Sequence, residues 1–167
     1  MAKKVFEWRK RDVVDVEVVF NTEKKVLLYF YWNIFSKKNS KRVFRNIVLP
    51  SENYVEWHRR ITEKLANVKW NYNTFPCKVT IDFVAWNKVK WDVDNACTSI
   101  FDTLTDVWLF PDDNKFIIQE LSARNVWYVK NLPITKVAIE PINFKPYDNN
   151  RDHKGDDLKE CKNIFNI

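Results

Sequence analysis

The chain has 167 residues and a mass of 20.2 kDa, which suits one domain, and its 46% share of hydrophobic residues excludes wholesale disorder. Its only glycine is Gly155, which excludes a glycine-rich phosphate loop or dinucleotide fingerprint, because both need several positions without a Cβ. Residues 1–91 hold 19 Lys and Arg against 9 Asp and Glu, whereas residues 92–167 hold 9 against 13. This asymmetry suits a protein that binds a polyanion on one surface and a cation on another; lysines that only keep an aromatic-rich domain soluble are the alternative.

Two strands and a helix are predicted in the first part of the chain. Val14, Val16, Val18 and Phe20 alternate with other residues, which predicts a half-buried strand, and residues 26–35 predict a more buried one. A polar, basic loop is expected over residues 37–42. A helix should then begin after Ser51 as its N-cap. Spacings of three and four give this helix one apolar stripe, made of Tyr54, Trp57, Ile61, Leu65 and Val68.

The second part predicts a strand, a helix and two more strands. Residues 77–87 alternate as a strand, Asp94 is the expected N-cap of the next helix, and Pro111 is expected to end it. The apolar stripe of this helix, which should be buried, is Cys97, Ile100, Phe101, Leu104 and Trp108. Residues 116–130 and 134–142 predict two strands joined as a hairpin. The expected fold class is α+β: a single domain with a mixed β-sheet and two main helices, in the order β-α-β-α-β-β after an extra N-terminal strand.

Three segments are expected: an N-terminal extension over 1–25 that adds a strand to the sheet, a main domain over 26–142, and a polar tail over 143–167. The three cysteines form no C-x-x-C pair and there are two histidines, which argues against a disulfide framework, a zinc finger or a three-histidine zinc site. No apolar stretch approaches the ~20 residues of a membrane span. We therefore expect a cytoplasmic protein with no membrane partner.

Two acidic pairs are the strongest functional signal. Asp92 and Asp94 follow a predicted strand, and residues i and i+2 of an extended chain point to the same side, so both could bind one divalent cation. Asp112 and Asp113 follow the next helix. Mg²⁺ prefers oxygen ligands, and carboxylates around one or two such ions suit phosphodiester hydrolysis. Each pair also has a purely structural interpretation, Asp94 as a helix cap and Asp112-Asp113 as a turn.

The order and spacing of these motifs resemble the RusA family of Holliday junction resolvases. The similarity runs through Asp92-Val93-Asp94-Asn95, Phe101-Asp102-Thr103-Leu104-Thr105, Val107-Trp108 and Asp112-Asp113. It continues into residues 129–136, which resemble the family's closing hairpin. Upstream, the segments that resemble its N-terminal half are Lys37-Lys38-Asn39-Ser40 and Leu49-Pro50-Ser51, with Tyr54 and Trp57. Together these segments cover about residues 27–142.

The resemblance implies a homodimeric endonuclease that uses Mg²⁺, with Mn²⁺ as a second usable ion, and resolves four-way DNA junctions by paired nicks in the cytoplasm of a bacterium or phage-infected host. By motif, the catalytic and metal-binding aspartates would be Asp92, Asp94 and Asp113, and Asp112 is a further candidate ligand. The family also has a functional lysine four residues after the second aspartate, where this chain has Thr98. The candidates to replace that lysine are Lys88, Lys90 and Lys115.

A length argument favours a metal site shared between two chains. A helix over 94–108 would be ~21 Å long, whereas the five steps from Trp108 to Asp113 return at most ~17 Å. Unless the helix is shorter, Asp113 cannot rejoin Asp92 and Asp94 in one chain. We therefore expect Asp113 to complete the site of a twofold partner.

Basic and polar side chains near these motifs are expected to contact DNA phosphates: Lys37, Lys38, Asn39, Ser40, Lys41, Arg42, Lys88 and Lys90. Arg59 and Arg60 either extend this surface or form a solvated charge run. Two other functions stay open. One is a branched-DNA-binding protein of the same fold that has lost cleavage, since Thr98 replaces the lysine; the other is a basic interaction module with no nucleic-acid partner.

Overall fold

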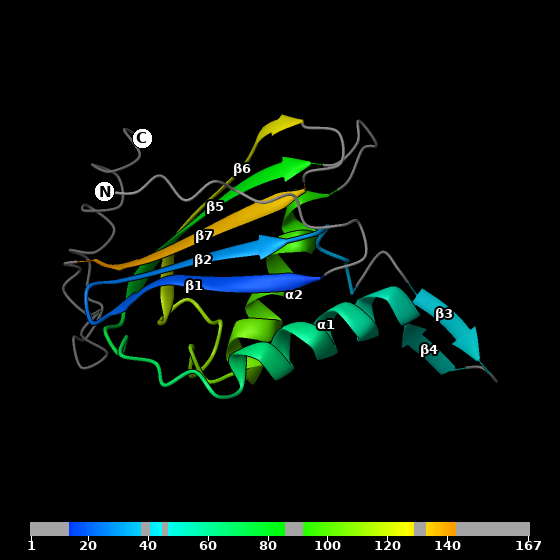
Figure 1. Ribbon diagram of the computed structural model, residues 1–167, viewed down its shortest axis with the longest axis horizontal. Coiled ribbons are helices and arrows are strands. Elements are labelled where there is room, and N and C mark those ends of the chain that lie inside the picture. The colour runs from blue at the N-terminus through cyan, green and yellow to red at the C-terminus, as the bar shows by residue number, and fades with distance from the viewer. Residues whose placement is uncertain (1–13, 38–40, 45–46, 86–91, 129–132, 143–167) are drawn as a thin grey trace, which may run out of the picture.

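The computed structural model describes residues 14–37, 41–44, 47–85, 92–128 and 133–142. Within these ranges the elements are, in chain order, β1 (Asp15–Thr22), β2 (Lys25–Tyr31), β3 (Lys41–Phe44), β4 (Ile47–Pro50), α1 (Glu52–Leu65), β5 (Cys77–Ala85), α2 (Val93–Asp106), β6 (Ile118–Tyr128) and β7 (Ile134–Pro141). Five strands form one mixed sheet in the order β1-β2-β7-β5-β6, and β3 pairs with β4 in a separate ribbon beyond α1 (Figure 1). The single α+β domain expected from the sequence is confirmed.

The last two strands do not form the expected hairpin. β5 lies between β6 and β7, pairing in parallel with β6 and antiparallel with β7. The physical reason is the course of α2, which carries the chain back to the start of β5, so that Ile118 of β6 pairs with Cys77. β6 therefore enters beside β5 in the same direction, and β7 takes the other edge of β5. The prediction of two strands was right, but their pairing was wrong.

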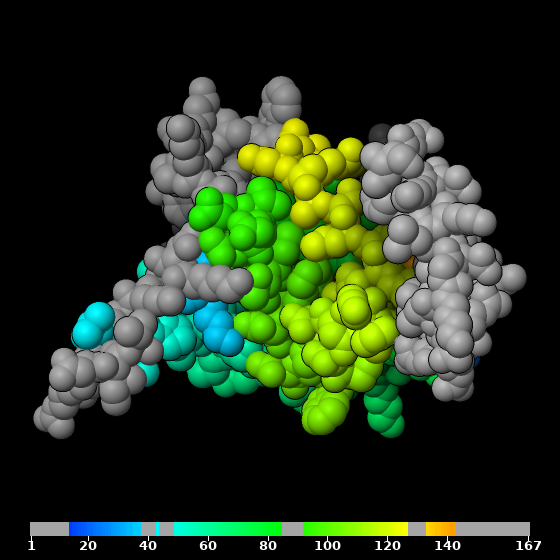
Figure 2. Space-filling view, turned by 180° about the vertical axis from the view of Figure 1, so that it is seen from behind, coloured from blue at the N-terminus to red at the C-terminus, as the bar shows by residue number. Residues whose placement is uncertain are grey.

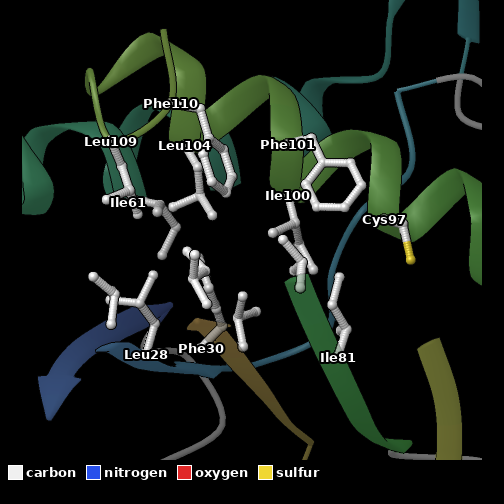
Figure 3. Close-up of a cluster of buried hydrophobic side chains, with 14 of the residues drawn as sticks. Leu28, Phe30, Ile61, Ile81, Cys97, Ile100, Phe101, Leu104, Leu109 and Phe110 are labelled. Carbon is white, nitrogen blue, oxygen red and sulfur yellow. The ribbon is translucent and has the colours of Figure 1, made fainter. Parts of the chain in front are cut away.

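Both helices pack on one face of the sheet, and the hydrophobic core lies between the two layers (Figure 3). Alternate residues of β5, Val79, Ile81 and Phe83, point into this core. The predicted stripe of α1 is buried at Tyr54, Trp57, Ile61 and Leu65, while Val68 follows the helix and packs partly against the core. Each fully buried aliphatic or aromatic side chain contributes about 1.5–3 kcal/mol relative to an exposed one.

Ser51 caps α1 as predicted. Its backbone is extended, with φ −63° and ψ 155°, and its hydroxyl oxygen accepts a hydrogen bond of 3.1 Å from the backbone N–H of Tyr54. One of the otherwise unpaired donors of the first turn is thereby satisfied. The helix then positions Trp57 and Ile61 against the sheet.

α2 ends at Asp106, before Pro111, and Trp108 is not part of the buried stripe. The Trp108 side chain is 83% exposed and its φ is +61°, a left-handed backbone that usually requires glycine. This turn lets Leu109 donate its N–H to the carbonyl of Leu104 at 3.0 Å and buries Leu109 and Phe110. The stripe prediction was wrong at Trp108 because the helical period stops before that residue.

β1 is the extra N-terminal strand, and it pairs antiparallel with β2. Val14, Val16 and Val18 pack partly against the core, as expected for the buried face of the strand. Phe20 was expected on the same face, but its side chain is 51% exposed. The register shifts between Val18 and Phe20, so the alternation that predicted burial of Phe20 is interrupted there. The remainder of the predicted extension (1–13) and the predicted tail (143–167) lie outside the described residues.

Candidate carboxylate site

Asp92 and Asp94 lie at the N-terminus of α2, which begins at the carboxyl edge of β5. Asp92, not Asp94, is the N-cap residue, with φ −89° and ψ 117°. The Asp92 carboxylate makes no capping hydrogen bond and accepts one of 3.0 Å from Nδ2 of Asn95. Asp94 is in the first helical turn, so the extended-chain alternation expected to align the two side chains does not apply. Both residues are exposed and near the positive end of the helix dipole.

The carboxylates of α2 act on titratable groups that are buried in or next to this helix. Burial, and after it the negative charge of Asp94, raises the pKa of the Cys97 thiol to about 11. Burial, and after it the negative charges of Asp102 and Asp106 farther along α2, raises the pKa of Tyr54 in α1 to about 12. The surface of α2 is therefore a row of carboxylates over a thiol and a phenol that stay protonated at neutral pH.

Asp112 and Asp113 lie in the loop after α2 and are both exposed. The Asp112 carboxylate accepts hydrogen bonds from the Asp113 backbone N–H at 2.8 Å and from Nδ2 of Asn114 at 2.7 Å. Asp112 therefore stabilises a turn, which is the purely structural interpretation given above for the Asp112-Asp113 pair. The carboxylate of Asp113 extends from this turn without an ion pair to any described residue.

The two acidic segments lie at opposite ends of α2. The helix has 14 residues, a length of ~20 Å, and Asp112 and Asp113 are followed by β6 at the amino end of β5, where Cys77 donates its N–H to Ile117. In the part of the chain that the structure describes, no group of three or more His, Cys, Asp or Glu side chains could hold a metal ion. One chain therefore does not bring Asp92, Asp94 and Asp113 together. Chain length is not the reason, because α2 ends at Asp106 instead of Trp108, and the seven steps to Asp113 could span ~23 Å. The separation comes from the course of the loop, which leads to β6.

Of the predicted DNA-contacting residues, Lys37 is the one whose side-chain contacts the structure gives. Its ammonium group pairs with Asp102 of α2 at 2.9 Å, and its backbone N–H donates to Oγ of Ser99 at 3.1 Å. Lys41 and Arg42 are in β3 rather than in the expected loop, because they pair with Leu49 and Pro50 of β4. The others, Lys38, Asn39, Ser40, Lys88 and Lys90, lie outside the described residues.

Arg59 and Arg60 form a charge-balanced surface on α1. Arg59 pairs with Glu56 at 3.0 Å and with Glu63 at 2.6 Å, and Arg60 pairs with Glu56 at 2.6 Å. Hydrogen bonds from Arg59 and then Arg60 lower the pKa of Glu56 to about 2. These contacts favour the solvated charge run over an extension of a DNA-binding surface.

Thr98 and Lys115 bear on the missing family lysine. The Thr98 hydroxyl donates to the backbone carbonyl of Asp94 at 3.0 Å, so it is bonded within its own helix. Lys115 is exposed next to the Asp112-Asp113 loop, with its Nζ 5.2 Å from the centroid of the Phe116 ring. Among the described residues, Lys115 is thus the candidate cation at the Asp113 end of α2.

The exposed aromatic side chain of Trp108 was missed by sequence reasoning. It stands between α2 and the Asp112-Asp113 loop, and Figure 2 shows the surface of this region, in green to yellow, on one face of the molecule. The stripe at helical spacing suggested that Trp108 is buried. One signal in the sequence could have warned against this: helices often end with a glycine in a left-handed turn, and no glycine is present near this helix end, so another residue has to adopt that turn.

No protein-family model matches the sequence, and no curated protein does. Among the described residues, no helix combines the length and the apolar character needed to cross a membrane.

Proposed function

We propose that the chain is one subunit of a magnesium-dependent endodeoxyribonuclease that resolves four-way DNA junctions as a homodimer. The observation that carries the proposal is the position of Asp94 and Asp113, exposed at the two ends of α2. A twofold axis that sets two copies of α2 antiparallel puts the Asp94 end of one copy on the same side as the Asp113 end of the other. The RusA-like spacing of the motifs supports the same residues.

The donor set fits a hard divalent cation. Asp92 and Asp94 supply carboxylate oxygens at an exposed helix end, and Mg²⁺ usually takes only one or two protein carboxylates and keeps several waters. In this proposal Asp92 and Asp94 of one copy and Asp113 of the other hold the ion. When bound, such an ion lowers the pKa of a water ligand and offsets charge on the scissile phosphate.

The protein side chains have separate tasks in this scheme. Asp112 orients the loop that carries Asp113, through its hydrogen bonds to the Asp113 N–H and to Asn114. Lys115, exposed on the same loop, is the cation available to the DNA backbone there. Lys37 is held against α2 by Asp102 and would bind phosphate only by exchanging that partner.

A second function is favoured by Thr98. Because its hydroxyl is bonded to the Asp94 carbonyl, it supplies no positive charge where the resembling family has a lysine. A chain without that charge could bind branched DNA and leave it uncut. The same assay distinguishes this binder from the nuclease.

The test mixes two inactive variants on a labelled four-way junction in Mg²⁺. Asp94→Asn and Asp113→Asn should each abolish cleavage when alone. In a 1:1 mixture with random exchange, half of the dimers carry both chains, and each of these has one intact site of two, so about one quarter of the wild-type sites return. Those sites should give single nicks instead of paired cuts.

The matched control is Asp106→Asn, which removes one exposed carboxylate from the same helix and should leave cleavage unchanged. Retarded but intact junction with wild-type chain, in Mg²⁺ and Mn²⁺ alike, would establish the binder and refute the nuclease. No recovery in verified heterodimers would refute the shared site.

A further inference from the structure

β6 is a long strand at the edge of the sheet. Among the described residues it pairs only with β5, along its other side, and it spans 11 residues. Leu121 is 51% exposed and Val126 is 47% exposed on this strand, whose surface appears in yellow in Figure 2. Such an edge presents backbone donors and acceptors beside apolar side chains, which makes it a template for pairing with another strand.

On the face of the sheet away from the helices, two ion pairs join β5 to β6. Glu120 pairs with Lys78 of β5 at 3.0 Å, and Arg124 pairs with Asp82 of β5 at 2.7 Å. Ser122 lies between them, in register with Thr80. Each end group remains largely open to solvent, with 54% of the Glu120 side chain and 68% of the Arg124 side chain exposed. Both can therefore take a second partner of opposite charge.

The sequence of β6 is self-complementary about Ser122. Two residues before Ser122 is Glu120 and two after it is Arg124, with the apolar residues Leu121 and Ala123 between. We infer that β6 pairs antiparallel with β6 of a second copy of this chain, with Ser122 opposite Ser122. In this register Glu120 lies opposite Arg124 of the second copy, twice per dimer, and Leu121 lies opposite Ala123.

Charge selects this register over its neighbours. A shift that sets Glu120 opposite Glu120, or Arg124 opposite Arg124, juxtaposes like charges, which destabilises the pairing, whereas facing opposite charges stabilise it. Only the Ser122-centred register pairs the two charged residues with each other. It also joins existing ion pairs into one row of alternating charge across both sheets. The row runs through Lys136, Asp82 and Arg124 of one copy and continues through Glu120 and Lys78 of the second.

The pairing keeps both helical layers on the same side of a continuous sheet. Residues 120–124 alternate regularly opposite residues 78–82 of β5, so a twofold axis that passes between the two Ser122 residues is perpendicular to the sheet. It turns the two α2 helices antiparallel, which brings the Asp94 end of one to the same side as the Asp113 end of the other. The inference rests on β6 alone and does not depend on the proposed nuclease activity.

Disulfide cross-linking tests the register in the absence of DNA and metal. In a Cys161→Ser background, Ser122→Cys should oxidise rapidly to a disulfide-linked dimer, because directly opposed Cβ atoms are ~4.5–5.5 Å apart. Cys77 and Cys97 are buried and do not interfere. The matched control is Thr80→Cys, on the same face but one strand inward, whose mate would be three strand spacings away, ~14 Å.

Charge variants test the ion pairs. Glu120→Arg alone and Arg124→Glu alone should each sediment as monomers of 20.2 kDa, whereas wild type should sediment at twice that mass. A 1:1 mixture of the two variants should recover the dimer, because every facing pair is then of opposite charge. A wild-type monomer, Ser122→Cys oxidation no faster than Thr80→Cys oxidation, or a dimer that neither charge variant weakens would each overturn the proposal.

Discussion

Replacing Trp108 tests the left-handed helix end directly, because it should reverse the usual ranking of alanine and glycine. A non-glycine residue at φ +61° carries a backbone cost of ~1–2 kcal/mol, which Trp108→Gly removes and Trp108→Ala keeps. Glycine gives back ~0.4–1 kcal/mol through its freer unfolded chain. Both variants lose the same small burial of a side chain that is 83% exposed. Trp108→Gly should therefore be more stable than Trp108→Ala by ~0.5–1 kcal/mol.

The control pair is Val55→Ala and Val55→Gly on α1, where the side chain is 46% exposed and the backbone is helical. There alanine should be the more stable variant, by ~1 kcal/mol. Urea unfolding followed by circular dichroism gives all four free energies, and thermal midpoints should differ by ~2–4 °C per kcal/mol. An alanine at 108 as stable as glycine would refute the left-handed turn.

Two further predictions concern titratable groups. The Arg124 guanidinium, more than Lys136, lowers the pKa of Asp82 from its usual 3.8. The ionised Asp82 carboxylate therefore stabilises the folded protein above pH 3.8, and this stabilisation is lost as the pH falls through the lowered pKa of the folded state. Asp82→Asn should therefore destabilise the protein at pH 7 but not at the acid end of urea-unfolding titrations, and a pH-independent difference would contradict this. Burial raises the pKa of Cys77 to about 12 and of Cys97 to about 11, so in a Cys161→Ser variant neither thiol should react with a thiol reagent at pH 8 until urea unfolds the chain. Stoichiometric labelling of the native protein would refute their burial.

The sequence by itself determined both helices, the five strands of the main sheet and most of the core, but not the β3-β4 ribbon, part of which was expected to be a loop. Period-two alternation identified β5, period-3.6 spacing identified the buried face of α1, and Ser51 identified its first turn, because these signals come from neighbours in the chain. The acidic residues were likewise found by their spacing. Their role as metal ligands stays a prediction, since the described part of one chain does not bring three of them together.

Tertiary structure decided what local patterns do not encode. Whether β6 pairs with β5 or with β7 depends on where α2 returns the chain, and the exposure of Trp108 depends on a turn in which Leu109 and Phe110 fill the core instead. The same return of α2 leaves β6 at the sheet edge and puts Asp94 and Asp113 at opposite helix ends. Strand partners and edges are set by contacts between distant residues, and no period in the sequence records them.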